Sequence, residues 1–230
     1  MTTDIPALLV VTGLQREAAI AAGTGVATIC SGGRHDVLAQ RLAAQRPPLG
    51  GVLSFGIAGG LSPDLKSGDV VVASHVLHGD ERYQADQRWH DAILRAAGHQ
   101  IRVKPGGISG SAEVMTRAAD KSTLQAQTGA IAIDMESHIA AAFAARHRLP
   151  FAAIRAIGDS SSRNLPEIAT DALRDDGSVD IVKVLRGLAG NPSQMPALVA
   201  AGIDSERAFA SLRRCRSLLG PLFGLGLAHI

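Results

Sequence analysis

Short runs of β-branched and other apolar residues alternate along the chain with longer segments rich in Ala, Leu and Arg. This order is typical of parallel strands, because each strand returns to the same edge of the sheet through a crossover that usually contains a helix. The predicted strands are Leu8–Thr12, Val26–Cys30, Gly51–Phe55, Asp69–Ser74, Ile101–Lys104, Ala130–Ile133 and Phe151–Ile157. The predicted helices are His35–Gln45, Gln87–Ala97, Ala118–Thr128 and Met135–Arg148. The sequence therefore predicts an α/β fold.

The chain changes character after the last predicted strand. Residues 171–180 are acidic and contain Gly, which indicates a surface loop before a helix over residues 181–188. Beyond a break at residues 190–192, two further helices are predicted, Pro196–Gly202 and Ser205–Leu219. We therefore expect a main domain over residues 1–190 and a C-terminal helical extension over residues 191–230, packed on it or mobile.

The charge balance argues against a nucleic-acid partner. The chain has 23 Lys and Arg residues against 21 Asp and Glu, an excess too small for a broad basic surface. Its two cysteines, Cys30 and Cys215, form neither a CxxC pair nor a disulfide framework. The N-terminal residues lack the basic run and apolar core of a signal peptide. These features lead us to expect a cytoplasmic protein with reduced thiols.

Carboxylates follow two predicted strands, at Asp134 and Glu136 after one and at Asp159 after the other. The carboxyl ends of parallel strands form the edge where open α/β folds bind ligands. A carboxylate at Glu136 could accept both hydroxyls of a cis-diol, and Met135 offers a soft apolar surface for a sugar. Plainer roles stay open at this point, because Asp134 suits a helix N-cap and Glu136 suits the positive end of the helix dipole.

A glycine-rich segment follows the predicted strand Gly51–Phe55. Gly56, Gly59 and Gly60 would let the backbone approach a ligand closely, although their spacing is neither a Walker loop nor a dinucleotide fingerprint. Together with the carboxylate segments, this stretch resembles the purine and uridine phosphorylase superfamily, which includes methylthioadenosine/S-adenosylhomocysteine nucleosidases. The matching segments are Gly56-Ile-Ala-Gly59-Gly60, Leu65-Lys-Ser-Gly-Asp-Val-Val-Val, Asp134-Met135-Glu136-Ser137 and Phe151-Ala-Ala-Ile-Arg-Ala-Ile-Gly158-Asp159, in the family's order and within residues 8–160.

The resemblance implies a single α/β domain with a mostly parallel, mixed central sheet flanked by helices. It also implies an enzyme that cleaves the N-glycosidic bond of a purine nucleoside, as a homodimer or higher homo-oligomer. No cofactor or metal is expected, although phosphate would be the co-substrate of a phosphorylase. Arg34, which follows two glycines, could bind that phosphate, and a surface Arg at a helix start is an equal alternative.

By the same resemblance, Glu136 binds the ribose 2′ and 3′ hydroxyls while Met135 packs against the sugar. Asp159 hands a proton to purine N7, and Glu17, at the end of the segment that begins at Gly13, orients the attacking water. On residue type alone, Glu17 is equally well a solvent-facing helix residue. The remaining expected substrate contacts are Ala58 and Gly59 in the glycine-rich segment and Val114 beside the base.

Two departures from the family pattern concern the base. Gly158 stands where the family often has Ser before the acid, so a hydroxyl is absent there. Around Val114 the pattern matches only loosely, and the usual aromatic stacking residue is absent. The base contacts are therefore less well defined by the sequence than the ribose contacts.

Within the superfamily, the chain is most similar to bacterial hopanoid-associated phosphorylases. The shared segments are Cys30-Ser-Gly-Gly, Phe55-Gly-Ile-Ala-Gly-Gly-Leu, Asp134-Met-Glu-Ser-His138, Asp176-Gly-Ser-Val-Asp180 and Asn191-Pro-Ser-Gln-Met-Pro196. This likeness implies adenosylhopane as substrate and adenine as product. A methylthioadenosine/S-adenosylhomocysteine nucleosidase and a non-catalytic nucleoside-binding protein are the alternatives, and the choice between water and phosphate stays open.

Two further segments leave alternatives open. The His75–Glu81 region matches no zinc motif and contains a Gly-Asp turn, and its likeness to the family places it near a subunit interface.

The C-terminal tail combines basic residues with an apolar run, so it could rest on the inner membrane, pack on its own core or form a lid. The tail residues concerned are Arg213, Arg214, Arg216, Leu218, Leu219, Leu222, Phe223, Leu225 and Leu227.

Overall fold

The computed structural model describes residues 7–46, 48–166 and 192–225. Its strands form one sheet in the order β2-β1-β3-β7-β6-β4-β5, and β8 pairs with both β3 and β4. The strands are β1 (Ala7–Thr12), β2 (Val26–Cys30), β3 (Leu49–Gly60), β4 (Val70–His78), β5 (Glu81–Gln84), β6 (Val103–Gly110), β7 (Ala132–Asp134) and β8 (Phe151–Asp159). Five strand pairs are parallel and three are antiparallel, so the predicted mostly parallel, mixed sheet is confirmed.

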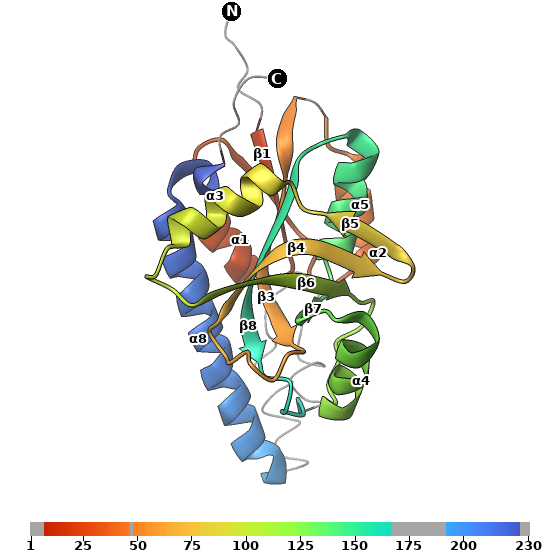
Figure 1. Cartoon of the computed structure of the whole chain (residues 1–230), viewed down its shortest axis with the longest axis vertical. Coiled ribbons are helices and arrows are strands. Elements are labelled where there is room, and N and C mark those ends of the chain that lie inside the picture. Colours follow the sequence, from red (N-terminus) through yellow and green to blue (C-terminus); the bar gives the residue numbers. More distant parts are fainter. Residues whose placement is uncertain (1–6, 47, 167–191, 226–230) are drawn as a thin grey trace, which may run out of the picture.

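Helices cover both faces of this sheet (Figure 1). They are α1 (Gln15–Ala21), α2 (His35–Ala43), α3 (Gln87–Ala97), α4 (Ala118–Thr128), α5 (Ser137–His147) and α8 (Met195–Leu219). One core cluster joins the sheet to α1, α3 and α8, and a second joins it to α2 and α5. Consecutive residues of β1 alternate between the two, with Leu8 in the first cluster and Leu9 in the second. This double burial explains why β1 is apolar throughout its middle.

Strand β3 is longer than the sequence predicted. The glycines at 56, 59 and 60 were expected in a loop, but they lie in the strand, and Gly59 and Gly60 pair with β7. A Cβ atom on Gly56 would lie 2.5 Å from Arg155 Nη1 and 2.6 Å from Glu17 Oε1. The absence of a side chain there lets two charged side chains approach the strand.

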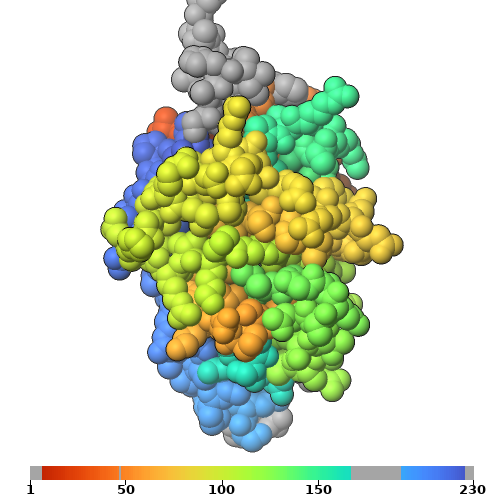
Figure 2. All heavy atoms as spheres, in the orientation of Figure 1, coloured from red at the N-terminus to blue at the C-terminus, as the bar shows by residue number. Residues whose placement is uncertain are grey.

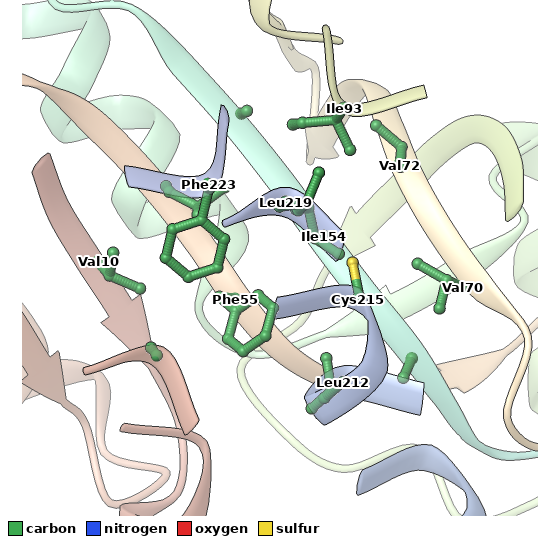
Figure 3. Packing of buried hydrophobic residues seen from close by; sticks show 14 of the residues in the cluster. Val10, Phe55, Val70, Val72, Ile93, Ile154, Leu212, Cys215, Leu219 and Phe223 are labelled. Carbon is green, nitrogen blue, oxygen red and sulfur yellow. The ribbon is translucent and has the colours of Figure 1, made fainter. Parts of the chain in front are cut away.

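The two helices predicted near the C-terminus are one continuous helix, α8, which passes through Gly202. An interior glycine costs a helix only about 1 kcal/mol, and tertiary packing outweighs that cost. The packing comes from Leu212, Cys215 and Leu219, which join the core cluster of α1, α3 and α8. Figure 3 shows these side chains between the strands and α3.

The apolar end of the tail also belongs to this core. Phe223 is fully buried, and its ring meets that of Phe55 edge to face, with 5.1 Å between the ring centroids (Figure 3). Leu225 is buried as well. Of the alternatives for the tail, core packing is therefore the one found for Leu219, Phe223 and Leu225, whereas Leu218 and Leu222 are partly exposed.

Several element boundaries differ from the prediction. The sequence analysis gave no bounds for α1, although it considered Glu17 as a helix residue. It did not predict β5, which forms a hairpin with β4 across the expected turn at Gly79 and Asp80. The loop over residues 171–180 and the helix over residues 181–188 lie outside the described residues, and the division of the chain near residue 190 stays a prediction. Among the described helices, none combines the length and apolarity needed to cross a membrane.

Candidate active site

A cavity of about 290 Å³ lies where β1, β2, β7 and β8 end and beside the last residues of β3. Its described lining consists of Gly13, Leu14, Glu17, Gly33, Ile57, Ala58, Gly59, Glu113, Val114, Met115, Ile133, Asp134, Met135, Glu136, Asp159 and Leu165. Strand ends converge here because the parallel strands β1, β3 and β8 run in one direction. The cavity thus occupies the edge of the sheet at which a ligand was expected.

The structure brings nearly all of the predicted site residues to this cavity. Those in its lining are Gly13, Glu17, Ala58, Gly59, Val114, Met135, Glu136 and Asp159. Arg34 is the exception, because its neighbour Gly33 lines the cavity whereas the Arg34 side chain pairs with Asp36 at 2.7 Å on the surface. Arg34 therefore lies outside the described lining, and its role in binding phosphate stays a prediction.

Glu17 is held by backbone amides. Its Oε2 accepts hydrogen bonds from the amides of Gly13 and Leu14, both at 2.8 Å, and its Oε1 accepts one from Ile57 at 2.7 Å. The residue is only 2% exposed, so the solvent-facing alternative is wrong. Burial raises the pKa of this carboxyl, while Arg155 and the three amides oppose the rise. Glu17 is thus a fixed carboxylate at the cavity wall.

Glu136 lies beside the backbone of Gly13, which directly follows β1. Its Oε1 accepts a hydrogen bond from Ser31 Oγ at 2.9 Å and would lie 2.7 Å from a Cβ atom on Gly13. Burial raises the pKa of Glu136 to about 7, and nearby Asp134 and Glu17 add to the rise while Arg155 opposes it. The group therefore changes its charge near neutral pH.

A buried arginine that the sequence analysis did not single out lies behind these carboxylates. Arg155, in the middle of β8, has no solvent exposure, and its Nη2 contacts Asp134 Oδ2 and lies 3.8 Å from Glu136 Oε2. The same nitrogen donates to Ser54 Oγ at 2.6 Å and to Ser137 Oγ at 3.1 Å. A charged residue inside an otherwise apolar strand was the available signal, because a fully buried arginine requires anionic partners.

Asp134 is not the N-cap residue of α5, which is Glu136, but its side chain does bond the start of that helix. Its Oδ2 accepts a hydrogen bond from the amide of Ser137, the first residue of α5, at 3.1 Å. The contact with Arg155 is additional. Asp134 therefore ties the start of α5 to the centre of β8.

Asp159, the last residue of β8, has a buried cationic partner that was also not predicted. Lys121 Nζ contacts Asp159 Oδ2, and Lys121 has no solvent exposure. Burial raises the pKa of Asp159, and Lys121 is the largest influence in the opposite direction. The predicted helix Ala118–Thr128 contained Lys121, but no sequence pattern linked it to a strand end 38 residues away.

The cavity lining also contains apolar side chains. Val114, Met115, Ile133 and Leu165 line it, and Val114 is 45% exposed. None of the described lining residues is aromatic, in agreement with the sequence. A Cβ atom on Gly158 would have its nearest neighbour, Ile57 Cδ1, at 3.7 Å, so the position has room for a small side chain.

The charged groups in the described lining are all carboxyl groups, with no Lys, Arg or His. Arg155 and Lys121 lie behind this lining and pair with Asp134 and Asp159, so they offset part of its negative charge. Within the described parts of the chain, no three His, Cys, Asp or Glu side chains are grouped to hold a metal ion. The arrangement suits hydrogen bonding to hydroxyls and proton transfer by carboxyl groups.

Comparison with known proteins identifies the family of the chain. The sequence model of the phosphorylase superfamily matches residues 8–186. The 5′-methylthioadenosine/S-adenosylhomocysteine nucleosidase of Anoxybacillus flavithermus is 29% identical over an alignment of 132 residues, and the match covers 49% of this chain and 57% of that enzyme. The chain thus spans little more than half the length of this relative.

Solved structures of related enzymes share the fold. The Helicobacter pylori 5′-methylthioadenosine/S-adenosylhomocysteine nucleosidase has a TM-score of 0.64 at 16% identity, over 81% of this chain and 98% of that one. The Helicobacter pylori futalosine hydrolase has a TM-score of 0.62 at 17% identity, over 81% and 98%. The Neisseria meningitidis nucleosidase, in complex with methylthio-immucillin-A, has a TM-score of 0.66 at 17% identity, over 95% and 99%.

Proposed function

Since the chain belongs to the phosphorylase superfamily, we propose that it hydrolyses the N-glycosidic bond of an adenosine derivative and releases adenine. The observation that carries this proposal is the convergence of Glu17, Glu136 and Asp159 on one cavity whose described charged lining is wholly acidic. Each of the three carboxyl groups has a different set of hydrogen-bond partners, which suits three different roles.

Glu136 and Met135 hold the ribose. A carboxylate beside the backbone of Gly13 can accept hydrogen bonds from two neighbouring hydroxyls, and Met135 packs against the sugar. As the bond from C1′ to N9 lengthens, the ribose gains positive charge, which the surrounding carboxylates stabilise. A wall of this charge thus binds the transition state more tightly than the neutral substrate.

Asp159 and Glu17 move the protons. Protonated Asp159 gives its proton to purine N7 as the electron pair of the breaking bond passes to the base. A water molecule attacks C1′ and gives a proton to Glu17, whose pKa is raised by burial toward the range useful for a base. One water molecule is consumed, and adenine and a ribose derivative are formed.

Water is a better nucleophile for this site than phosphate. A phosphate ion would find no Lys, Arg or His in the described lining to bind it directly, because Arg155 and Lys121 lie behind the carboxyl groups with which they pair. Arg34, the residue considered for phosphate, has Asp36 as a partner and is absent from the lining. We therefore favour hydrolysis over phosphorolysis.

The 5′ substituent is proposed to be apolar. Val114, Met115 and Leu165 supply apolar lining. The cavity is small for a ligand site, and a long substituent could leave it beside the exposed Val114. The resemblance to hopanoid-associated phosphorylases favours adenosylhopane, whose hopane part would lie outside the cavity. Methylthioadenosine, named for the Anoxybacillus relative, is the second candidate because it is small enough to be enclosed.

Adenine release from adenosylhopane and from methylthioadenosine, each with and without phosphate, tests the proposal. We expect release from at least one substrate at a rate independent of phosphate, and a higher kcat/KM for adenosylhopane. Phosphate-dependent release would contradict hydrolysis. Binding of both nucleosides without any release would indicate a non-catalytic nucleoside-binding protein. Gel filtration with light scattering tests the accompanying expectation of a homodimer or higher homo-oligomer.

A further inference from the structure

Lys121 lies in an unusual position for a lysine. Helix α4 is at the molecular surface (Figure 2), yet the Lys121 side chain on its inner face has no solvent exposure. Its Nζ contacts Asp159 Oδ2 and donates to Ser160 O at 3.2 Å and to Arg163 O at 3.1 Å. An ammonium group has three hydrogens, so these acceptors use all of them and leave none for a ligand.

Burial of an ammonium group is costly unless its partners compensate for the lost water. The compensation here is concentrated in one short segment, residues 159–163, which begins with the proposed acid. Lys121 is therefore placed to hold that segment in one conformation. It also occupies Oδ2 of Asp159, which leaves Oδ1 as the oxygen that can face the purine.

We propose that Lys121 is a positioning residue that acts through Asp159, fixing the carboxyl group beside the base and setting the upper pH limit of the reaction. This inference rests on the proposed function, in which Asp159 is the acid. It goes beyond that function because it assigns a role to a residue that cannot touch the substrate.

Charged groups reach Asp159 from three parts of the structure. Burial raises the pKa of Asp159, and so does Asp204 on α8. Lys121 on α4 and Arg163 in the loop after β8 lower this pKa. Loss of Lys121 removes the largest influence that lowers this pKa, so the protonated acid persists to higher pH. An enzyme that needs protonated Asp159 then keeps its activity to higher pH in the variant than in the wild type.

Titration of Asp159 tests the electrostatic half of the proposal without any turnover. The side-chain carboxyl carbon can be followed by NMR in protein labelled with ¹³C at Asp, and D159N identifies its signal. We expect the midpoint to move to higher pH in K121M and to stay near the wild-type position in K104M, which removes a lysine from Asp64 instead. An unmoved midpoint in K121M would overturn the proposal even if the enzyme proved to act on a different substrate.

A double-mutant cycle tests the positioning half, with adenine release from the better of the two nucleosides as the readout. We expect K121M to lower kcat about tenfold at neutral pH, with the alkaline limb displaced upward, and to have little further effect in D159N. Equal fold losses in wild type and D159N would mean that Lys121 acts elsewhere. If K121M does not fold, K121R serves instead, because it keeps the charge. K121R should lower kcat without moving the alkaline limb of the pH profile of kcat. A shift of that limb in K121R would contradict the proposal.

Discussion

Arg155 Nη2 and Glu136 Oε2 lie 3.8 Å apart, with Arg155 fully buried and Glu136 in the cavity lining, and the same nitrogen also contacts Asp134. Glu17 acts on this guanidinium as well, through its charge. One arginine thus compensates a group of carboxyl groups that face the cavity. The stability of the site and its chemistry therefore depend on the same side chain.

Replacement of Arg155 by Met should destabilise the protein by about 3–5 kcal/mol, because buried carboxyl groups would lose their cationic partner. The urea midpoint of unfolding measures the effect. Arg46→Met is the control, since Arg46 is exposed, and it should change stability by less than about 0.5 kcal/mol. Similar midpoints for the two variants would contradict the role given to Arg155.

Replacement of Glu136 by Gln should change how stability depends on pH. The pKa of Glu136 is about 7 in the folded protein and lower in the unfolded protein. The protonated side chain therefore contributes its full share to the free energy of unfolding below about pH 4.5, and this stabilisation is lost as the pH rises toward 7. Gln cannot ionise, so E136Q should gain up to about 3 kcal/mol relative to wild type between pH 4.5 and pH 8. Thermal unfolding at several pH values measures this difference. A constant difference from wild type across that range would show that Glu136 titrates normally.

Asp159→Asn should separate binding from turnover. The amide keeps the shape of the side chain but has no proton to give, so we expect kcat to fall about 10²- to 10⁴-fold while nucleoside affinity stays within about tenfold. Calorimetric binding and adenine release measure the two effects. Asp64→Asn, at an exposed carboxyl, is the matched control and should retain full activity. Unchanged adenine release in D159N would contradict the assignment of the acid.

Two glycines offer a matched pair of substitutions. A Cβ atom at Gly56 would lie within 2.6 Å of buried atoms of Arg155 and Glu17, so Gly56→Ala should cost about 1–3 kcal/mol and lower activity. At Gly158 the nearest atom would be 3.7 Å away, so Gly158→Ala should leave stability unchanged or raise it by up to about 1 kcal/mol. Thermal unfolding and adenine release of both variants are the measurements. Equal loss at the two positions would refute the close-approach explanation for Gly56.

The sequence predicted the sheet well because its strands are distinguished by local composition. Buried strands such as β1 and β8 are apolar runs bounded by breaks, and the order of strands and helices indicates a parallel arrangement. The end of β3 was not predictable in this way, since glycine disfavours strands. It stays extended because β7 and β8 pair with it, and that pairing depends on residues far along the chain.

The candidate site was predictable where it follows strand ends or a family motif, as at Glu136 and Asp159. Its cationic partners were not, because Arg155 and Lys121 reach the carboxyl groups only through the tertiary fold. Lys121 and Asp159 are 38 residues apart, so no helical or strand periodicity could indicate their contact. The charge balance of a buried site thus depends on pairings between distant segments.

Helix α8 supplies Leu212, Cys215 and Leu219 to the core that covers one face of the sheet. A ribosome makes these residues after all the described strands, so that face stays uncovered until α8 has emerged. The N-terminal strands must wait in a state with exposed apolar surface, which is the kind of surface that chaperones bind. Premature termination before α8 should therefore give an insoluble product rather than a smaller folded protein.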